Sequence, residues 1–527
     1  MTTFRGPQYD TPRYPPTCWD LVEQGAEAFT DKVILADEHD RSLTGAELRD
    51  AALATAAWLS ELGIAPGSRV SWQLPTTLEA MIVKLALARI GAVQNPIIPI
   101  LREAEVDFIT DQTGAEYLLV PEEWRGYEHG ALARALARKR GLTPLIIDQA
   151  TDPTSLAGGL RLPKGDIASL PSAPKRGDEI RWLYFSSGTT SAPKGIRHTD
   201  ASVMASASGV IGQLGCGLAD INPLPFPITH IGGITMLSAA LLTGMELLLF
   251  EAFDPATTPA RMAELEVTML GSAVPFYMAY MAAQQRHGDQ PLFTHLRACV
   301  GGGAPIPAEI SAMVRGVLGG SGIANAWGLT EFPVAVSPKP DDPSEWLDHT
   351  VGQPVPGVTV RVVDDEGVER EAGAEGELRL KGPQCFAGYL DSSLDADAFD
   401  DEGWFRTGDL GLVDADGNVR ITGRLKDLII RNAENISAQE IEEALQRHTA
   451  IADVAVIGVP DMRTGERVCA VVVPVRGEAV TLSALAAHCR ELGLARQKIP
   501  ERLELVEALP RNTLGKILKN VLRAEFH

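Results

Sequence analysis

Short apolar segments that alternate with helical patterns run through the first part of the chain. Residues 70–74, 117–120 and 145–147 are short, largely apolar segments typical of strands. Residues 78–90 place their large apolar side chains at helical spacing. Strands that alternate with helices usually pair in parallel, with helices covering the faces of the sheet. The pattern therefore predicts layered α/β domains.

Three changes in sequence texture predict how the chain divides. A segment rich in Pro and Gly at 158–177 precedes a second α/β unit, which we expect to be organised around a loop that follows the apolar strand 180–185. Turn residues between alternating strands at 358–381 predict a small antiparallel β subdomain. The texture changes a third time at 423–427, and we expect a large N-terminal domain of two α/β subdomains plus this β subdomain over 1–424, a connection at 425–427 and a small α+β domain over 428–527.

Charge and cysteine usage narrow the class of protein. The net charge of −22 disfavours nucleic acid and anionic membranes as partners, because both attract basic surfaces. The six cysteines are widely spaced with no Cys-x-x-Cys, which is typical of reduced thiols in a cytosolic protein. Neither a secretory signal at the N-terminus nor an uninterrupted transmembrane segment is evident. We expect a cytoplasmic protein without stable membrane insertion.

A loop rich in hydroxyl groups follows the apolar strand 180–185. Five of the six residues from Ser186 to Ser191 carry a hydroxyl, and a lysine follows three residues later. Backbone N–H groups, hydroxyls and one cation in a short loop suit a polyphosphate, so we predict that the loop binds ATP. A flexible Ser/Gly linker is the alternative, but the preceding strand and the Pro-Lys-Gly ending favour a phosphate site. The candidate residues are Ser186, Ser187, Gly188, Thr189, Thr190, Ser191 and Lys194.

Four further clusters have chemistry that fits a nucleotide, although each has an ordinary alternative. The glycine turn in 299–305 could lie against a flat base or be a plain tight turn. Residues 325–331 offer an indole for stacking and a carboxylate for Mg²⁺, or simply a core tryptophan and a solvated glutamate. Asp409 could bind a ribose diol or close an Asx-turn. Lys516, between a glycine turn and the terminal helix, would alone be interpreted as surface charge.

Together, these five motifs resemble those of the adenylate-forming superfamily, which includes acyl-CoA synthetases, luciferases and peptide-synthetase adenylation domains. They occur in the family's order, and the resemblance extends from about residue 20 to the C-terminus. It implies an enzyme that uses ATP and Mg²⁺ to convert a carboxylic acid to its adenylate. It also implies a mobile C-terminal domain that swings to allow attack by the thiol of coenzyme A.

The resemblance assigns roles to individual residues. Thr330 and Glu331 resemble the phosphate and Mg²⁺ ligands, and Asp409 and Arg424 the ribose contacts. Lys516 resembles the catalytic lysine that steadies the carboxylate and the α-phosphate, while Lys426 lies at the hinge. The expected adenine-binding region comprises Gly302, Gly303, Ala304, Pro305, Asn325, Ala326, Trp327, Gly328 and Leu329, with Trp327 where a tyrosine is commoner.

Residues around His230 bear on the choice of acid. Adenylation domains for amino acids place an aspartate after this position to hold the ammonium, but this chain has Ile231. A buried ammonium without a carboxylate is costly, so amino-acid substrates are rejected. His230 resembles the family's gate to the acyl tunnel, with a hydrogen-bonded structural histidine as the alternative. Ile231, Ile234, Met236 and Leu237 suggest an apolar pocket for a fatty, alicyclic or steroid-derived acid.

The chain departs from the family's pattern near Ala433, and this departure bears on the acceptor of the acyl group. CoA ligases commonly have a glycine pair there, along the pantetheine path. Ala433 adds only a methyl group, so CoA remains the expected acceptor. The alternatives are an acyl-AMP ligase that supplies a carrier protein, an aromatic-acid CoA ligase, a luciferase-like oxidase by fold analogy alone, and a non-catalytic protein that binds acyl nucleotides. The retained lysines and carboxylates argue against the last, and a homodimer is compatible with the resemblance.

Overall fold

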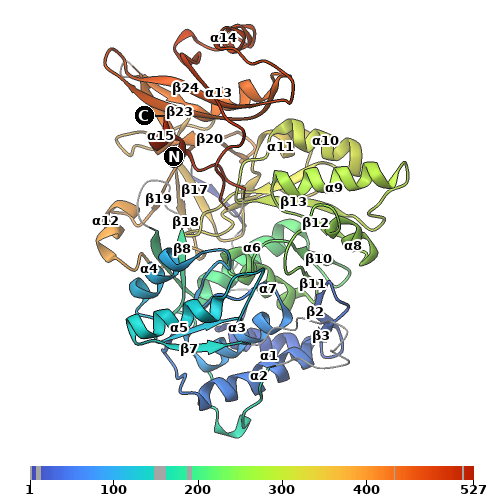
Figure 1. The fold of residues 1–527 in the computed structure, drawn as a ribbon. Coiled ribbons are helices and arrows are strands. Elements are labelled where there is room, and N and C mark those ends of the chain that lie inside the picture. The colour runs from blue at the N-terminus through green and yellow to red at the C-terminus, as the bar shows by residue number, and fades with distance from the viewer. Residues whose placement is uncertain are drawn as a thin grey trace.

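The computed structural model describes residues 3–7, 14–147, 162–186, 193–431, 434–512 and 515–526, with Glu434 and Asn435 described by their backbone alone. Ser187, Gly188, Thr189, Thr190, Ser191 and Ala433, all expected at the site, lie outside the described residues. The helices and strands form a large body below and a smaller lobe above, which the C-terminal segment builds (Figure 1). This arrangement confirms the predicted fold class.

The first sheet has six strands, five of which run parallel while the last is antiparallel to its neighbour. In spatial order they are β7 (Thr143–Ile146), β6 (Tyr117–Val120), β4 (Arg69–Trp72), β5 (Val93–Pro96), β8 (Ile180–Ser186) and β9 (Lys194–Thr199). The predicted parallel pairing is therefore confirmed. β8 and β9, which flank the hydroxyl-rich segment in the sequence, pair in antiparallel orientation at one edge of this sheet.

The second sheet shows that the predicted division of the α/β body was wrong. Its strands are β10 (Ile221–Leu224), β11 (Glu246–Leu249), β2 (Val33–Asp37) and β3 (Ser42–Thr44). β2 and β3 come from the start of the chain, whereas β8 and β9, expected to centre this unit, complete the first sheet. Alternation of strands and helices predicts the type of pairing, but a crossover can deliver a strand to either sheet.

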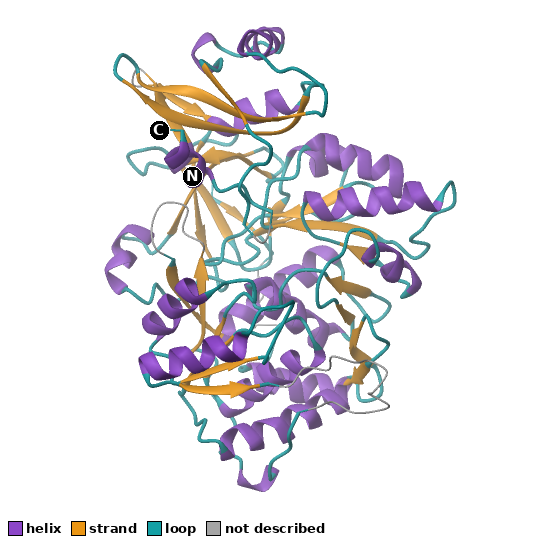
Figure 2. Cartoon of the chain, in the orientation of Figure 1, coloured by secondary structure: helices purple, strands orange, loops and turns teal. Residues whose placement is uncertain are grey.

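Helices fill the space between and around these sheets, as the purple ribbons of Figure 2 show. α3 illustrates the packing, because every residue in it except Arg89 is buried. A capping box begins α2: Thr44 Oγ1 accepts from the Glu47 N–H and Glu47 Oε2 accepts from the Thr44 N–H. The helices of this region are α1 (Cys18–Ala28), α2 (Gly45–Glu61), α3 (Leu78–Ile90), α4 (Glu103–Thr113), α5 (His129–Arg140), α6 (Asp200–Leu214) and α7 (Ile231–Thr243).

A third, three-stranded parallel sheet extends the second α/β layer. It consists of β12 (Met269–Leu270), β13 (Ala298–Gly302) and β14 (Ile323–Ala326), with α8 (Thr258–Glu264), α9 (Val274–His287), α10 (Ala308–Leu318) and α11 (Ser344–His349) near it. A short antiparallel pair, β15 (Val336–Ser337) and β16 (Gln353–Pro354), follows. The carboxyl ends of β13 and β14 carry the glycine turn and the Trp327 motif, so parallel pairing places these motifs side by side.

The predicted β subdomain is confirmed as an antiparallel sheet. Its order is β1 (Phe4–Arg5), β17 (Thr359–Val363), β18 (Gly376–Lys381), β19 (Phe405–Val413) and β20 (Val419–Arg424), and α12 (Asp395–Ala398) lies in one of its connections. β1 was not predicted because two residues carry no readable alternation.

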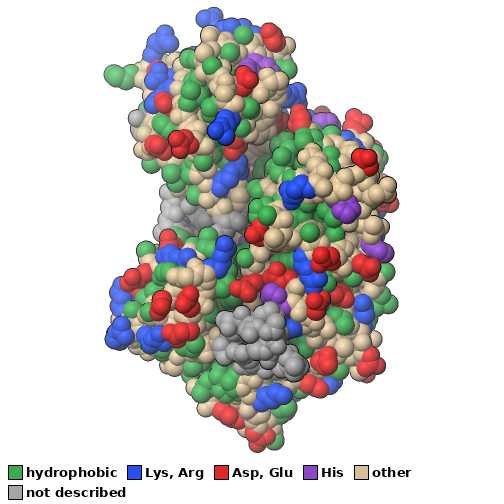
Figure 3. All heavy atoms as spheres, turned by 45° about the vertical axis from the view of Figure 1, so that its right-hand side comes forward, with side chains coloured by type: hydrophobic (Ala, Val, Ile, Leu, Met, Phe, Trp, Pro, Cys, Tyr) green, Lys and Arg blue, Asp and Glu red, His purple; other side chains and the backbone are tan. Residues whose placement is uncertain are grey.

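The smaller lobe is the expected α+β unit. Its sheet contains β21 (Leu428–Arg431), β22 (Glu434–Ser437), β23 (Ile451–Asp461), β24 (Gly465–Pro474) and β25 (Arg502–Leu505), and its helices are α13 (Ala438–Gln446), α14 (Leu482–Glu491) and α15 (Lys519–Glu525). On the face in Figure 3, acidic and basic side chains are interspersed over this lobe and the body below. Within the described ranges, no helix is both long and apolar enough to cross a bilayer.

Candidate active site

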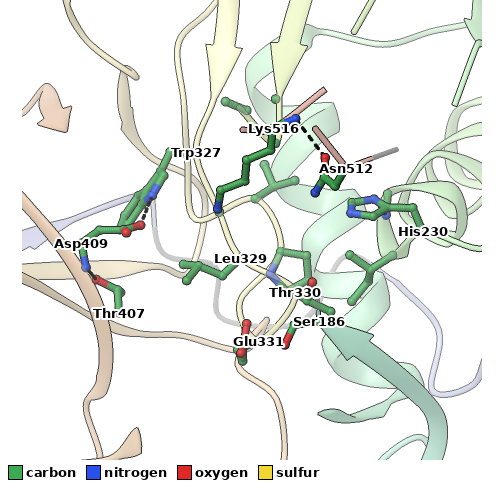
Figure 4. A pocket seen from close by; sticks show the side chains of 18 of the residues that line it. Ser186, His230, Trp327, Leu329, Thr330, Glu331, Thr407, Asp409, Asn512 and Lys516 are labelled. Atoms are coloured by element: carbon green, nitrogen blue, oxygen red, sulfur yellow. Dashed lines mark hydrogen bonds between the residues drawn. The ribbon is translucent and has the colours of Figure 1, made fainter. Parts of the chain in front are cut away.

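One cavity of about 1260 Å³ lies where the α/β body, the β subdomain and the C-terminal lobe meet. Figure 4 shows its centre: Trp327 and Asp409 on one side, His230 on the other and Lys516 between them. The expected site residues that line the cavity are Ser186, Lys194, His230, Gly302, Gly303, Ala326, Trp327, Gly328, Leu329, Thr330, Glu331, Asp409, Arg424, Lys426 and Lys516. Of the other described candidates, Ala304, Pro305 and Asn325 do not line it.

Asp409 is a buried carboxylate of the cavity, with an exposed fraction of 2%. Its Oδ2 accepts from the Trp327 indole N–H at 2.9 Å, and the Nε of Arg424 lies 2.8 Å from its Oδ1. The hydroxyl of Thr407 accepts from the Asp409 N–H, which fixes the backbone. A carboxylate can accept about four hydrogen bonds. Asp409 is therefore oriented and retains capacity for a further hydroxyl donor.

Tyr389 links the two parts of the expected phosphate site, and sequence reasoning missed it. Its hydroxyl donates to Glu331 Oε1 at 3.0 Å, and the Nζ of Lys194 lies 5.0 Å from its ring centroid. Burial and the Glu331 charge raise the pKa of Tyr389, so the phenol remains a donor. The sequence carries no local signal for this contact because 58 residues separate the partners.

His198 holds the backbone of Thr330 and was also missed. Its Nε2 lies 2.8 Å from the Thr330 carbonyl oxygen, and its Nδ1 lies 2.9 Å from the Ser202 hydroxyl. Burial lowers the pKa of His198 to about 4, so the ring is neutral near pH 7. A carbonyl only accepts, so Nε2 carries the proton and Nδ1 accepts from the hydroxyl. The motif carrying Thr330 and Glu331 is thus tied to α6.

Lys516 enters the cavity from the C-terminal lobe. Gly515 takes a φ of +79°, a left-handed turn that favours glycine, and the Lys516 N–H donates to Asn512 Oδ1 at 2.9 Å. The side chain extends between Trp327 and His230 (Figure 4). Burial first, and then the nearby cations Arg424 and Lys426, lower the pKa of Lys516 to about 8. The lysine is therefore charged at neutral pH but poorly solvated.

His230 caps α7, as the structural alternative expects, and it also lines the cavity, while its role as a gate stays a prediction. Its Nδ1 accepts from the Gly232 N–H at 3.1 Å. Burial lowers the pKa of His230 to about 4, leaving a neutral ring. Of the four apolar residues that follow, Ile231 and Met236 line the cavity, whereas Ile234 and Leu237 face the hydrophobic core. The helical period explains this, because all four cannot share one face.

Lys426 lies in a single 3-10 turn, Leu425–Asp427, between β20 and β21. Burial, with the charge of Arg424, lowers the pKa of Lys426. Across this turn, the Ser437 hydroxyl donates to the Thr422 carbonyl at 2.8 Å, and Arg447 pairs with Glu309 of α10 at 3.3 Å. Both contacts join the C-terminal lobe to the rest of the protein while the lobe is oriented so that Lys516 lies in the cavity.

A two-domain α/β fold with a cavity of this composition at the domain junction defines an adenylate-forming enzyme. The chain belongs to the AMP-binding enzyme family, whose sequence model matches residues 22–390, and the model for the AMP-binding enzyme C-terminal domain matches residues 440–516. Within the adenylate-forming superfamily, the protein is an AMP-forming CoA ligase of the acyl/aryl type.

The names of similar proteins specify different carboxylic acids. The chain is 32% identical over 515 residues to a medium-chain fatty-acid–CoA ligase of Escherichia coli, covering 96% of this chain and 90% of that one. It is 32% identical over 517 residues to a salicyl-AMP ligase / salicyl-S-ArCP synthetase of Mycobacterium tuberculosis, covering 95% and 89%. ATP-bound MatB from Rhodopseudomonas palustris superposes with a TM-score of 0.84 at 27% identity, covering 96% and 99%.

Proposed function

We propose that the protein activates a hydrophobic carboxylic acid with ATP and transfers the acyl group to CoA. The observation that carries this proposal is the composition of the part of the cavity around His230 and the start of α7, which we call the acid end. Its described lining residues between Val210 and Met236 include no Asp, Glu, Lys or Arg. An ammonium or a second carboxylate buried there would lack an opposite charge, which is costly. Val210, Leu214, Phe226, Ile231 and Met236 instead offer apolar surface to an acyl group.

In the first half-reaction, an oxygen of the acid bonds to the α-phosphorus of ATP. The bond from that phosphorus to the oxygen bridging to the β-phosphate breaks, and pyrophosphate leaves. Two anions meet in this step, so cations must lie where negative charge accumulates. We assign Lys516 to the carboxylate and the α-phosphate, and the loop from Ser186 to Lys194 to the β- and γ-phosphates. Asp409 and Arg424 would bind the ribose.

Glu331 fits a magnesium site that is completed by the nucleotide. One of its oxygens accepts from Tyr389, and the other has no hydrogen-bond partner among the described residues. Among all the residues that the structure describes, no three or more His, Cys, Asp or Glu side chains form a cluster suited to a metal. Mg²⁺ commonly binds one or two carboxylates together with substrate phosphates. The ion would offset phosphate charge, with Glu331 fixing it next to Thr330.

In the second half-reaction, the thiol sulfur of CoA bonds to the acyl carbon, AMP leaves with the bonding electrons and the thiol proton is released. Lys516 occupies the cavity in the present orientation of the lobe. A lysine delivered by a mobile domain can withdraw after adenylation and open the site to the thiol. We propose that the turn containing Lys426 is the hinge for this movement.

A panel of acids tests the function. Acetate, octanoate, palmitate, benzoate, a cyclohexane carboxylate, a steroid carboxylate, malonate and an amino acid are compared by AMP release with and without CoA. We expect CoA-dependent AMP release and thioester formation with one or more of the apolar acids, and none with malonate or the amino acid. Activity confined to a charged acid would contradict the proposal. Adenylate formation without any CoA thioester would favour a carrier protein as acceptor.

Tyr389→Phe tests how the metal carboxylate is held. The variant keeps the ring near Lys194 but removes the hydroxyl that donates to Glu331. We expect the Mg²⁺ concentration for half-maximal pyrophosphate release to rise about 3- to 10-fold, which corresponds to one lost hydrogen bond. Calorimetry of ATP binding with and without Mg²⁺ should show the loss only with the metal. Tyr117→Phe, outside the cavity lining, is the control; equal behaviour of both variants would contradict the expectation.

A further inference from the structure

Lys84 is a fully buried cation that the proposed reaction does not use. It lies on α3, and its Nζ is 5.8 Å from the ring centroid of Trp72 on β4 and 5.7 Å from that of Trp182 on β8. Indole faces attract a cation at such distances. They replace only part of its hydration, however, and burial of a charge without further partners is costly. An apolar side chain would fill the same space at a lower cost in free energy, so a specific role for the amine is expected.

The polar contact of Lys84 leads to the cavity. Its Nζ donates to the Ile228 carbonyl oxygen at 3.4 Å, and the Ile228 N–H donates to Thr76 Oγ1 at 3.3 Å. Thr76 lies two residues before the start of α3, so both polar backbone groups of Ile228 are tied to this region. A Cβ at Gly233 would lie 2.4 Å from the same carbonyl oxygen, so the first turn of α7 packs directly on it.

Ile228 is the centre of residues 226–230, which we call the wall segment. Its two ends, Phe226 and His230, line the acid end of the cavity, and their rings meet edge to face at 6.3 Å between centroids. The His230 N–H donates to the Pro227 carbonyl at 3.0 Å, which makes the segment one tight turn. A displacement of the Ile228 carbonyl would therefore move both rings.

We propose that Lys84 is a positioning residue for acid binding: its ammonium holds the Ile228 carbonyl and thereby fixes Phe226 and His230 across the acid end of the cavity. This inference rests on the proposed function in one respect, namely that the acid binds at this end. It predicts that Lys84 influences the KM for the acid and leaves the KM for ATP unchanged, because the wall segment lies on the side of the cavity away from Asp409 and Trp327 (Figure 4).

The protonation of Lys84 supports this assignment and gives it a pH signature. Burial lowers the pKa of Lys84 to about 7. The titratable group that interacts with Lys84 is the Cys18 thiol from α1, and Cys18 in turn lies near Asp200 of α6 and the Tyr184 phenol of β8. Burial raises the pKa of all three groups. A charged donor makes a stronger hydrogen bond than a neutral amine. As the pH rises through about 7, the wall segment is held less firmly and the KM for the acid should increase.

Lys84→Met tests the inference, using whichever acid of the panel the protein activates. Methionine keeps an unbranched side chain between the two indoles but cannot donate. We expect the acid KM at pH 6.5, measured by pyrophosphate release, to rise about tenfold, as for a lost hydrogen bond from a charged group. The ATP KM should stay within about twofold of the wild-type value. The increase in acid KM near pH 7 should disappear, while any change near the pKa of Lys516 at about 8 should remain.

Thr76→Val removes the second tether of Ile228 and keeps the test decisive if Lys84→Met does not fold. It should raise the acid KM and preserve its dependence on pH near 7. Thr113→Val is the matched control, because the Thr113 hydroxyl bonds only carbonyls of its own helix. Equal changes in the acid and ATP KM values, a pH step that persists without Lys84, or no effect of Thr76→Val would overturn the inference. A failure of the proposed function would show separately, in the acid panel.

Discussion

Lys516→Ala is expected to slow adenylate formation from acid and ATP by about 10²–10³-fold, the typical effect of removing one group that stabilises transition-state charge. The reason is positional: Lys516 is a cation of the C-terminal lobe whose side chain extends between Trp327 and His230 in the cavity. Thioester formation from synthetic acyl-AMP and CoA should be nearly unchanged, because that step begins after the lysine's task is complete. Pyrophosphate release and thioester formation, measured separately, check the two halves.

The pH dependence gives this prediction a second readout. The pKa of Lys516 is lowered to about 8, so its charged fraction falls as the pH rises through that value. For the wild type, kcat/KM for adenylation should therefore decline above pH 8, and the variant should lack this decline. Lys498→Ala, which removes a lysine of the same lobe that pairs with Glu440 outside the cavity, is the control. Equal losses in both half-reactions would show that Lys516 does not have the proposed role.

Much of the fold could be predicted because single segments carry strong local signals. The helix over 78–90 agrees with α3 to the residue, since a threonine cap precedes it and Gly91 in a left-handed conformation ends it. The sheet membership of β2, β3, β8 and β9 could not be predicted in the same way. It depends on which crossover the chain takes, and hydrophobic periodicity contains no information about that choice.

The candidate site divides along the same line. Glu331 and Asp409 were found because each lies in a short motif whose residue types suit a nucleotide and which resembles a motif of the family. Tyr389, His198 and Lys84 were missed because each acts on a backbone or side-chain group far away in the sequence. Their chemistry becomes visible only from contacts and burial. Residues that position a catalytic group are thus harder to predict from the sequence than the catalytic group itself.

Glu331→Gln is expected to have the second large effect. Glutamine is nearly isosteric with glutamate and its amide oxygen can still accept from the Tyr389 hydroxyl, so the contact that positions residue 331 is preserved while the charge is lost. A neutral amide is a poorer ligand than a carboxylate for a hard cation such as Mg²⁺. We expect adenylate formation at low Mg²⁺ to fall by about 10²–10³-fold, with partial recovery as the metal concentration increases.

The same variant separates a metal ligand from a structural carboxylate. Calorimetry should show that ATP binds wild type and variant equally well in EDTA, and that added Mg²⁺ strengthens binding much more in the wild type. Glu345→Gln, at an exposed position on α11, should match the wild type in both measurements. An identical Mg²⁺ titration for Glu331→Gln and wild type would mean that the carboxylate serves only to accept from Tyr389. If Tyr389 and Glu331 both act through one bound ion, the loss of adenylation in the Tyr389→Phe/Glu331→Gln double variant should be far smaller than the sum of the two single losses in free energy. The reason is that coupled residues share a single interaction.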